Sequence, residues 1–165
     1  MLTCVLGNTR KLGTPWGSNM SYLPDGMPTP FAGPDDAPFW EACNRRELRI
    51  QRCAECGTFR HPPLPICAVC RCTRCEWAEV SGTATVFSYT IAAHPTHPAL
   101  RGHPAYNIAV VLLDGAGDVR LVSNVMDVAN EDLTIGMRVR LQWDALSDGQ
   151  FLPRFVPLPE AGANA

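Results

Sequence analysis

The chain has 165 residues, a length that suits one domain or one domain with a small annex. Hydrophobic residues make up 46% of it, which is enough for a buried core in a chain of this size. The 16 acidic and 14 basic residues leave a net charge of −2, and this balance argues against a strongly cationic protein that binds phosphate backbones.

The sequence contains no apolar run of the roughly 18 residues that a membrane-spanning helix needs. Its first 20 residues also lack the apolar stretch of a signal peptide. We therefore expect a soluble protein in the reducing cytoplasm. In that compartment the eight cysteines are more readily explained by metal binding than by disulfides.

Residues 1–35 have mixed polarity and a proline-rich end, and we expect an extended, poorly packed lead-in. Asp36 then opens a short helix as an acidic cap, followed by Pro38, whose missing N–H costs nothing in a first turn. The helix ends near residue 44, because residues 48–52 alternate apolar and polar side chains as a strand does.

The second half of the chain is rich in β-branched and aromatic residues, which favour strands. Glycine and aspartate cluster at residues 114–118 and 147–149, as they do in turns between strands. Closely spaced strands with at most one small helix favour a small barrel or sandwich. We predict five of them, at residues 83–91, 106–113, 119–126, 137–143 and 151–156.

The strand at residues 106–113 is apolar on both faces. Ile108, Val110 and Leu112 alternate with Ala109, Val111 and Leu113. In an antiparallel barrel one face of a strand fills the core and the other usually meets water. The second face is therefore expected to be covered, by the helix and cysteine-rich annex, by another protein, or by both.

Two C-x-x-C pairs, with ten residues between them, dominate the annex: Cys53 with Cys56, and Cys67 with Cys70. Each such turn can present two thiolates to one ion, and two facing turns complete a tetrahedral four-sulfur shell. Zinc held in this way has no open position for water, so the site stabilises the fold and does not catalyse a reaction.

A third pair, Cys72 and Cys75, leaves other ligand sets open. It could replace the second pair, because its distance from the first pair also occurs in zinc sites, or six sulfurs could hold a larger cluster. Otherwise these two cysteines are small residues of a strand. A redox-active C-x-x-C would have to open a helix in a βαβ unit, and no such pattern surrounds these pairs.

The four histidines give little support for catalysis. His94, His97 and His103 each precede a proline in one loop, while His61 lies among the cysteines. The loop could hold a base cluster or a second metal, but a stiff, proline-locked connection explains it better. It contains no carboxylate, and the sequence has no nucleophile elbow, phosphate loop or H-E-x-x-H motif. We expect no catalytic residues.

Short motifs spread over residues 36–158 resemble those of a known family, the acyl-CoA-associated zinc-ribbon/OB-fold proteins, long classed as a domain of unknown function. The matching motifs are P-F-W-E-A at 38–42, E-L-R-I-Q-R-C at 47–53, C-G at 56–57, P-P at 62–63, the cysteines at 67 and 70, E-W at 76–77, V-S-G at 80–82, T-V-F-S-Y at 85–89, P-A-Y at 104–106, I-G-M at 135–137 and P-R-F at 153–155.

The resemblance implies a mainly β protein. A short N-terminal helix and a rubredoxin-like zinc ribbon would occupy residues 36–78, a five-stranded OB-fold barrel residues 79–158, and a tail would begin at 159. It also implies that structural Zn²⁺ is bound by Cys53, Cys56, Cys67 and Cys70. Arg71 departs from the pattern, since a second knuckle usually has glycine there. Together with the additional Cys72 and Cys75, this leaves the second ligand pair open.

Members of this family are non-catalytic partners of thiolase-like enzymes in acyl-CoA chemistry, and some are paired with aldolases that remove steroid side chains. The resemblance therefore implies an accessory subunit of a hetero-oligomer. It would dock on a thiolase or lipid-transfer-type aldolase in a lyase or acyltransferase complex, and it would meet acyl-CoA only indirectly.

The main alternative is an OB-fold and zinc-ribbon protein that binds nucleic acid. Phe87 and Tyr89 are expected on one face of a strand, where aromatic rings can stack on bases. However, no basic residue lies between Thr83 and His94, and the chain is net acidic. A third possibility is a stand-alone hydrolase that uses the histidine loop.

Overall fold

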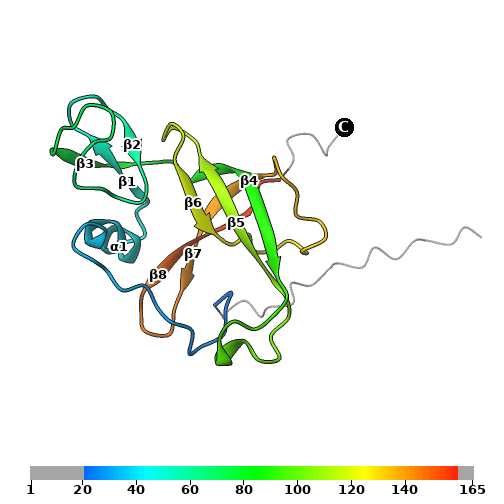
Figure 1. The fold of residues 1–165 in the computed structure, drawn as a ribbon. Helices are drawn as coiled ribbons and strands as arrows, with labels where there is room; N and C mark the ends of the chain where they lie inside the picture. The colour runs from blue at the N-terminus through cyan, green and yellow to red at the C-terminus, as the bar shows by residue number, and fades with distance from the viewer. Residues whose placement is uncertain (1–20, 160–165) are drawn as a thin grey trace, which may run out of the picture.

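The structure is a computed structural model that describes residues 21–159 (Figure 1). One short helix, α1 (Ala37–Asn44), precedes a three-stranded antiparallel sheet that carries the cysteine turns. This sheet has the order β2-β1-β3 and consists of β1 (Arg49–Cys53), β2 (Phe59–Arg60) and β3 (Cys75–Glu79). We call it the ribbon, and the ribbon together with α1 the annex.

A five-stranded antiparallel sheet with the order β6-β5-β4-β7-β8 follows the ribbon in the chain. It curls until its two edge strands approach each other, where Phe155 N donates to Asn124 O over 3.0 Å. The prediction of a mainly β fold with one short helix is confirmed. The strands are β4 (Thr83–Ala92), β5 (Tyr106–Leu113), β6 (Arg120–Ser123), β7 (Arg138–Ala145) and β8 (Phe151–Pro157), with a 3₁₀ turn at Pro98–Leu100 between β4 and β5.

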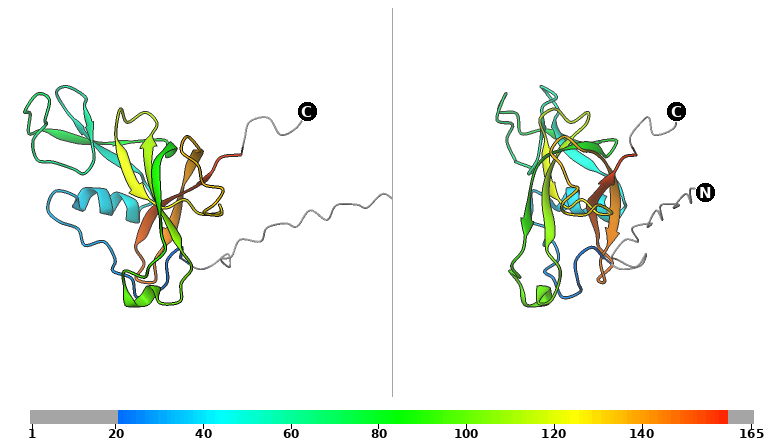
Figure 2. Two further views of the ribbon diagram at one scale, coloured as in Figure 1. Left: turned by 45° about the vertical axis from the view of Figure 1, so that its right-hand side comes forward. Right: turned by 90° about the vertical axis from the view of Figure 1, so that its right-hand side faces the viewer.

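A single hydrophobic core joins the annex to the barrel. Phe39 of α1 and Ile50 of β1 are buried in the same cluster as Val86, Val111 and Phe155 of the barrel. Burying a large apolar side chain contributes roughly 1.5–3 kcal/mol. Figure 2 shows α1 and the ribbon together on one side of the barrel, and this shared packing holds them there.

The start of the helix differs from the prediction in one detail. Ala37 begins the helix with Pro38 in its first turn, but the side chain of Asp36 does not cap the turn. Instead its Oδ1 accepts a hydrogen bond from Gly33 N (2.6 Å) and its Oδ2 accepts one from Trp40 Nε1 (3.1 Å). The carboxylate therefore fixes the preceding loop and the indole of Trp40.

A β-bulge in β4 corrects the prediction that Phe87 and Tyr89 share one face. The register with β5 shifts between Val86 and Ser88, so that Phe87 is an extra residue in the strand. A bulge moves every following side chain to the opposite face. Phe87 is therefore exposed, at 48%, whereas Tyr89 packs against the core.

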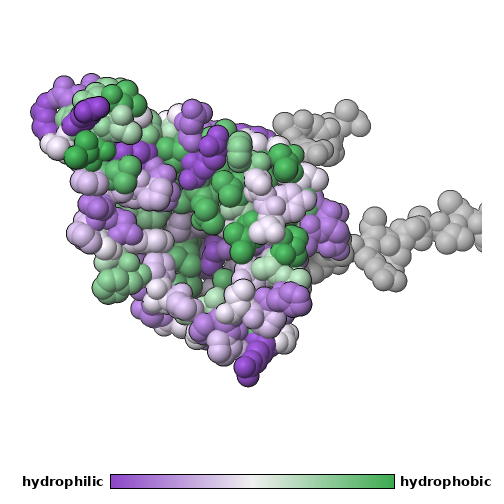
Figure 3. Space-filling view, in the orientation of Figure 1, coloured by the Kyte–Doolittle hydropathy of each residue, from purple (hydrophilic) through white to green (hydrophobic). Residues whose placement is uncertain are grey.

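The outer face of β5 remains only partly covered. Ile108, Val110 and Leu112 are half-buried there, whereas the inner face of the strand is fully buried. In the described part of the chain, α1 packs mainly against β1 and β8. The adjacent Phe87 and Val122 are 48% and 67% exposed. Figure 3 shows hydrophobic side chains gathered over the front of β4, β5 and β6.

A buried polar network closes the barrel at the end away from the ribbon. Arg154 Nε donates to Asp144 Oδ2 (3.2 Å), and Arg154 also donates to Asn124. Tyr22 N donates to Asp144 (3.3 Å), and the Tyr22 hydroxyl accepts a hydrogen bond from Asn107 Nδ2 (3.0 Å). Tyr22 is thus buried, although the sequence predicted a poorly packed lead-in.

Replacing Arg154 with Met should destabilise the protein by about 3–5 kcal/mol, because the buried carboxylate of Asp144 loses its charged partner. Urea unfolding at pH 7, followed by tryptophan fluorescence, measures the change. The double variant Asp144→Leu/Arg154→Met should recover much of the loss, since it leaves no uncompensated charge. Unchanged stability in the single variant would show that this ion pair contributes nothing.

Candidate metal centre

The first two C-x-x-C pairs bring four sulfur atoms together on the ribbon. The Sγ atoms of Cys53 and Cys70 lie 3.5 Å apart, those of Cys56 and Cys67 lie 3.6 Å apart, and all four lie within 4.8 Å of one another. Metal–sulfur bonds of about 2.3 Å in a tetrahedron separate the sulfurs by about 3.8 Å. The four side chains therefore fit around one ion. Within residues 21–159 no other group of metal-ligating side chains comes together in this way.

Both turns have the same backbone structure, although one has arginine where the other has glycine. Gly57 N donates to Cys53 O (3.0 Å), and Arg71 N donates to Cys67 O (2.9 Å). The two residues have left-handed φ angles of 72° and 63°. For an arginine this conformation costs roughly 1–2 kcal/mol. The second turn therefore keeps the usual backbone structure, although it has Arg71 where such a turn usually has glycine.

Cys72 and Cys75 lie outside the four-sulfur group. Cys72 Sγ accepts a hydrogen bond from Arg74 N (3.2 Å), and Cys75 Sγ, at the start of β3, accepts one from Gln51 Nε2 (3.4 Å). Of the ligand sets that the sequence leaves open, this geometry favours the first two pairs. Cys43 is buried in α1 as a packing residue, and burial raises the pKa of its thiol to about 12.

Backbone N–H groups and neighbouring sulfurs act in opposite directions on the four thiols of the cluster. The N–H of Cys56 is the main cause that lowers the pKa of Cys53, and the N–H of Cys70 has the same effect on Cys67. The N–H of Cys72 also lowers the pKa of Cys70, but contact with the sulfurs of Cys53 and Cys56 outweighs it and raises this pKa to about 12. Crowding thus opposes the ionisation of the fourth thiol.

The histidine loop connects β4 to β5 and contains the 3₁₀ turn. His97 Nδ1 accepts a hydrogen bond from Ala99 N (3.2 Å) and caps the 3₁₀ turn, and His103 Nδ1 lies 2.8 Å from Pro104 O. In the described residues these side chains and His94 join no group of three metal-ligating side chains. The loop therefore gives no support to the hydrolase alternative.

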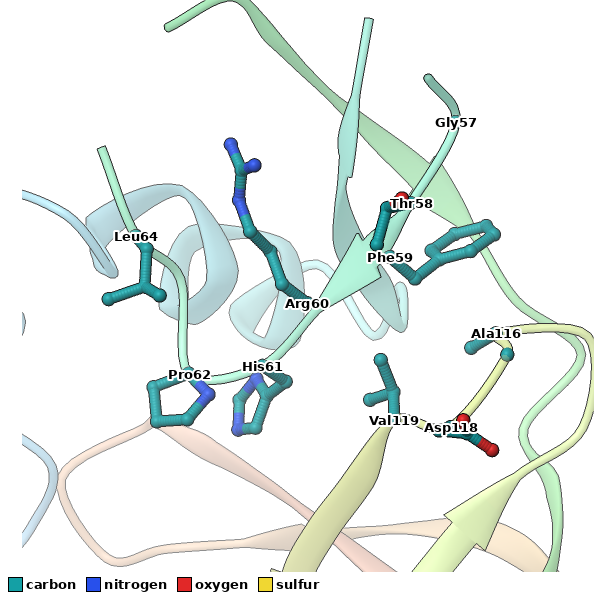
Figure 4. A pocket seen from close by; sticks show the side chains of 11 residues that line it. Gly57, Thr58, Phe59, Arg60, His61, Pro62, Leu64, Ala116, Asp118 and Val119 are labelled. Carbon is teal, nitrogen blue, oxygen red and sulfur yellow. The ribbon is translucent and has the colours of Figure 1, made fainter. Parts of the chain in front are cut away.

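The sequence did not indicate the clefts between the annex and the barrel. One of them, of about 490 Å³, separates the ribbon from the turn between β5 and β6. In Figure 4, Phe59 and His61 of the ribbon lie opposite Val119, whereas the guanidinium of Arg60 points away from the turn. Burial lowers the pKa of His61, so the imidazole is neutral at pH 7 and lines the cleft as an uncharged ring.

A ribbon with paired cysteine turns, followed by a curled five-stranded antiparallel barrel, defines the class of zinc-ribbon/OB-fold proteins. Family comparisons agree with this class. The family described as "ChsH2, rubredoxin-like zinc ribbon domain" matches residues 40–72, and "ChsH2, C-terminal OB-fold domain" matches residues 77–144. The predicted fold of helix, zinc ribbon and OB-fold barrel is confirmed.

Solved structures identify the family. A chain of the structure described as "Ltp2-ChsH2(DUF35) aldolase" is 40% identical, with a TM-score of 0.72, and the match covers 78% of this chain and 98% of that chain. The chain therefore belongs to the ChsH2 (DUF35) family, as the sequence motifs predicted. A DUF35 protein from Sulfolobus solfataricus shares the fold at 19% identity, with a TM-score of 0.55 over 77% of this chain and 87% of that one.

Two curated relatives are longer proteins. The "Probable enoyl-CoA hydratase alpha subunit" of Thermomonospora curvata is 41% identical over 131 residues, which cover 79% of this chain and 40% of that protein. The "3-oxo-4,17-pregnadiene-20-carboxyl-CoA hydratase alpha subunit" of Mycobacterium tuberculosis is 36% identical over 117 residues, which cover 71% and 36%. The chain thus spans 40% or less of the length of these relatives. Between residues 21 and 159, no helix is long and apolar enough to cross a membrane.

The strained arginine of the second turn can be tested with two variants. Arg71→Gly should be more stable than Arg71→Ala by about 1 kcal/mol, because both remove the side chain and only glycine adopts a positive φ without strain. Thermal unfolding of the two variants side by side measures the difference. Equal stability would show that the turn does not require the left-handed conformation.

Proposed function

We propose that Cys53, Cys56, Cys67 and Cys70 bind one structural Zn²⁺. The spacing of the four sulfurs and the match to a rubredoxin-like zinc ribbon support this assignment. When bound, the ion neutralises part of the thiolate charge and contributes its binding free energy to folding. The residues of the ribbon hold the ion in a closed shell, so that no position is left for a reacting molecule.

Purified protein should contain about one zinc per chain by elemental analysis. Cys53→Ser should abolish stoichiometric binding and unfold the ribbon, because the cluster loses one of its two buried thiolates. Cys75→Ser is the matched control and should retain the metal. Iron in the wild-type protein would contradict the assignment to zinc. Metal retained by Cys53→Ser but lost from Cys75→Ser would contradict the ligand set.

We propose further that the chain is a non-catalytic accessory subunit that docks on a thiolase-like aldolase. The observation that carries this proposal is the match to nearly the whole of a chain in a solved aldolase, at 40% identity. The four-sulfur group supports it, because four thiolates around one ion leave no open coordination position for a reacting molecule. The partly exposed apolar face of β5 supports the docking role.

The name of one relative suggests a substrate for the complex. The Mycobacterium tuberculosis relative is named for a steroid-derived acyl-CoA, so we propose that the complex acts on a steroid side-chain acyl-CoA in the cytoplasm. Its name also says hydratase, but the match covers 36% of that protein. We therefore assign no hydratase activity to this chain.

The structure weakens the alternative of a nucleic-acid-binding protein. Phe87 and Tyr89, the two aromatic residues expected to stack on bases, do not share a face of β4.

Co-expression with the thiolase-like aldolase of the same organism should yield one complex in size-exclusion chromatography with light scattering. The complex should cleave a steroid β-hydroxyacyl-CoA at least tenfold faster than the aldolase alone, because the subunit completes the assembly. The chain by itself should show no turnover. Separate peaks with undiminished aldolase activity, or turnover by the isolated chain, would contradict the accessory role.

A further inference from the structure

The barrel is open along part of the seam between its edge strands β6 and β8. At one end the seam is closed, where Phe155 N bonds to Asn124 O (3.0 Å) and Ser123 Oγ donates to Pro153 O (2.6 Å). Towards the start of β6 the strands separate. A cleft of about 380 Å³ lies there, and β6, β8 and α1 line it, with Phe39 and Trp40 from α1.

The backbone of β6 directs unpaired hydrogen-bonding groups into this cleft. Alternate residues of an antiparallel strand point their N–H and C=O groups to opposite sides. Leu113 N donates to Val119 O (3.1 Å), so residues 119, 121 and 123 face β5. The N–H and C=O groups of Arg120 and Val122 therefore point away from β5. They lie on the same side of the strand as Asn124 O, which accepts a hydrogen bond from β8. Within residues 21–159 the main-chain N–H and C=O groups of Arg120 and Val122 form no hydrogen bond.

The side chains of the same two residues are exposed on the partly covered outer face of the barrel. Val122 is 67% exposed and adjoins the apolar row of β5. The guanidinium of Arg120 stacks on the ring of Phe87, 4.1 Å from its centroid, and it forms no ion pair with a carboxylate in the described part of the chain. The edge thus offers main-chain groups, an apolar strip and one cation without a carboxylate partner.

We propose that an extended segment of the thiolase-like partner adds to β6 as a further strand. It would place an apolar side chain beside Val122 and an acidic side chain beside Arg120. An exposed strand edge is a template for pairing with another chain, and main-chain hydrogen bonds then supply affinity while side chains supply specificity. The inference rests on the proposed accessory function and names the surface through which it acts.

The chemistry of the edge favours an extended partner segment over other occupants. A helix satisfies its own backbone groups, so it would leave those of Arg120 and Val122 without partners. A second copy of β6 would bring a second Arg120 to the same strip and no carboxylate, and like charges at adjacent strands are unfavourable. An acidic, apolar segment of a different protein fits both features.

Proline at position 122 tests the pairing. Val122→Pro removes an N–H that the β5 ladder does not use, and proline is tolerated at strand edges when its nitrogen faces outward. It should weaken binding to the partner at least tenfold, whereas Val122→Thr, which keeps the N–H, should change the dissociation constant less than threefold. In a second pair of variants, Arg120→Glu should also weaken binding at least tenfold, whereas Arg120→Lys should change the dissociation constant less than threefold. This pair tests the proposal even where the proline variant does not fold.

Amide hydrogen exchange gives a direct signature. In the wild-type complex, exchange should slow at least tenfold at the amides of Arg120 and Val122, while those of Leu121 and Ser123 change little because β5 already protects them. Wild-type binding that neither Val122→Pro nor Arg120→Glu weakens would overturn the edge assignment and leave the accessory function standing. No binding by the wild type would overturn both. A dimer of the chain alone that Val122→Pro abolishes would replace the partner segment with a second copy.

Discussion

Four sulfur atoms held within 4.8 Å of one another are the constraint on which the annex depends. The ribbon contains three short strands, one of them two residues long, and a sheet of this size buries too little to be stable alone. Gathering the two cysteine turns fixes the ends of these strands and the loop that carries His61. That loop and α1 then form the annex walls of the clefts beside the barrel.

The barrel core holds the annex in place. Phe39 and Ile50 of the annex are fully buried in its core, so the ribbon is held against the barrel by packing. The barrel itself is incompletely closed, and its open seam lies beside α1. The described residues thus combine a group of four cysteine sulfurs with a sheet edge and an apolar face that remain accessible. This combination suits recognition of another protein better than chemistry on a small molecule.

Much of this could be predicted because the signals are local. The spacing of the cysteines predicted the four-sulfur group, and alternation and turn residues predicted the five barrel strands. The features that the sequence did not indicate depend on single insertions or distant contacts. One extra residue in β4 separates the faces of Phe87 and Tyr89 and leaves no trace in composition. Tyr22 binds Asn107 and Asp144, which are 85 and 122 residues away. Asp36 has the residue type of a cap, but two competing donors occupy its carboxylate.

The position of Tyr22 has a consequence for the behaviour of the annex. The chain contacts the barrel at Tyr22, leaves it to build α1 and the ribbon, and returns at β4, about 60 residues later. The annex is therefore a loop tethered at both ends to a folded body. Because both ends stay fixed, an annex that unfolds locally gains less conformational entropy than a free arm would. It would stay near the barrel, so that re-forming the ribbon becomes a local rearrangement and not a search through open solvent.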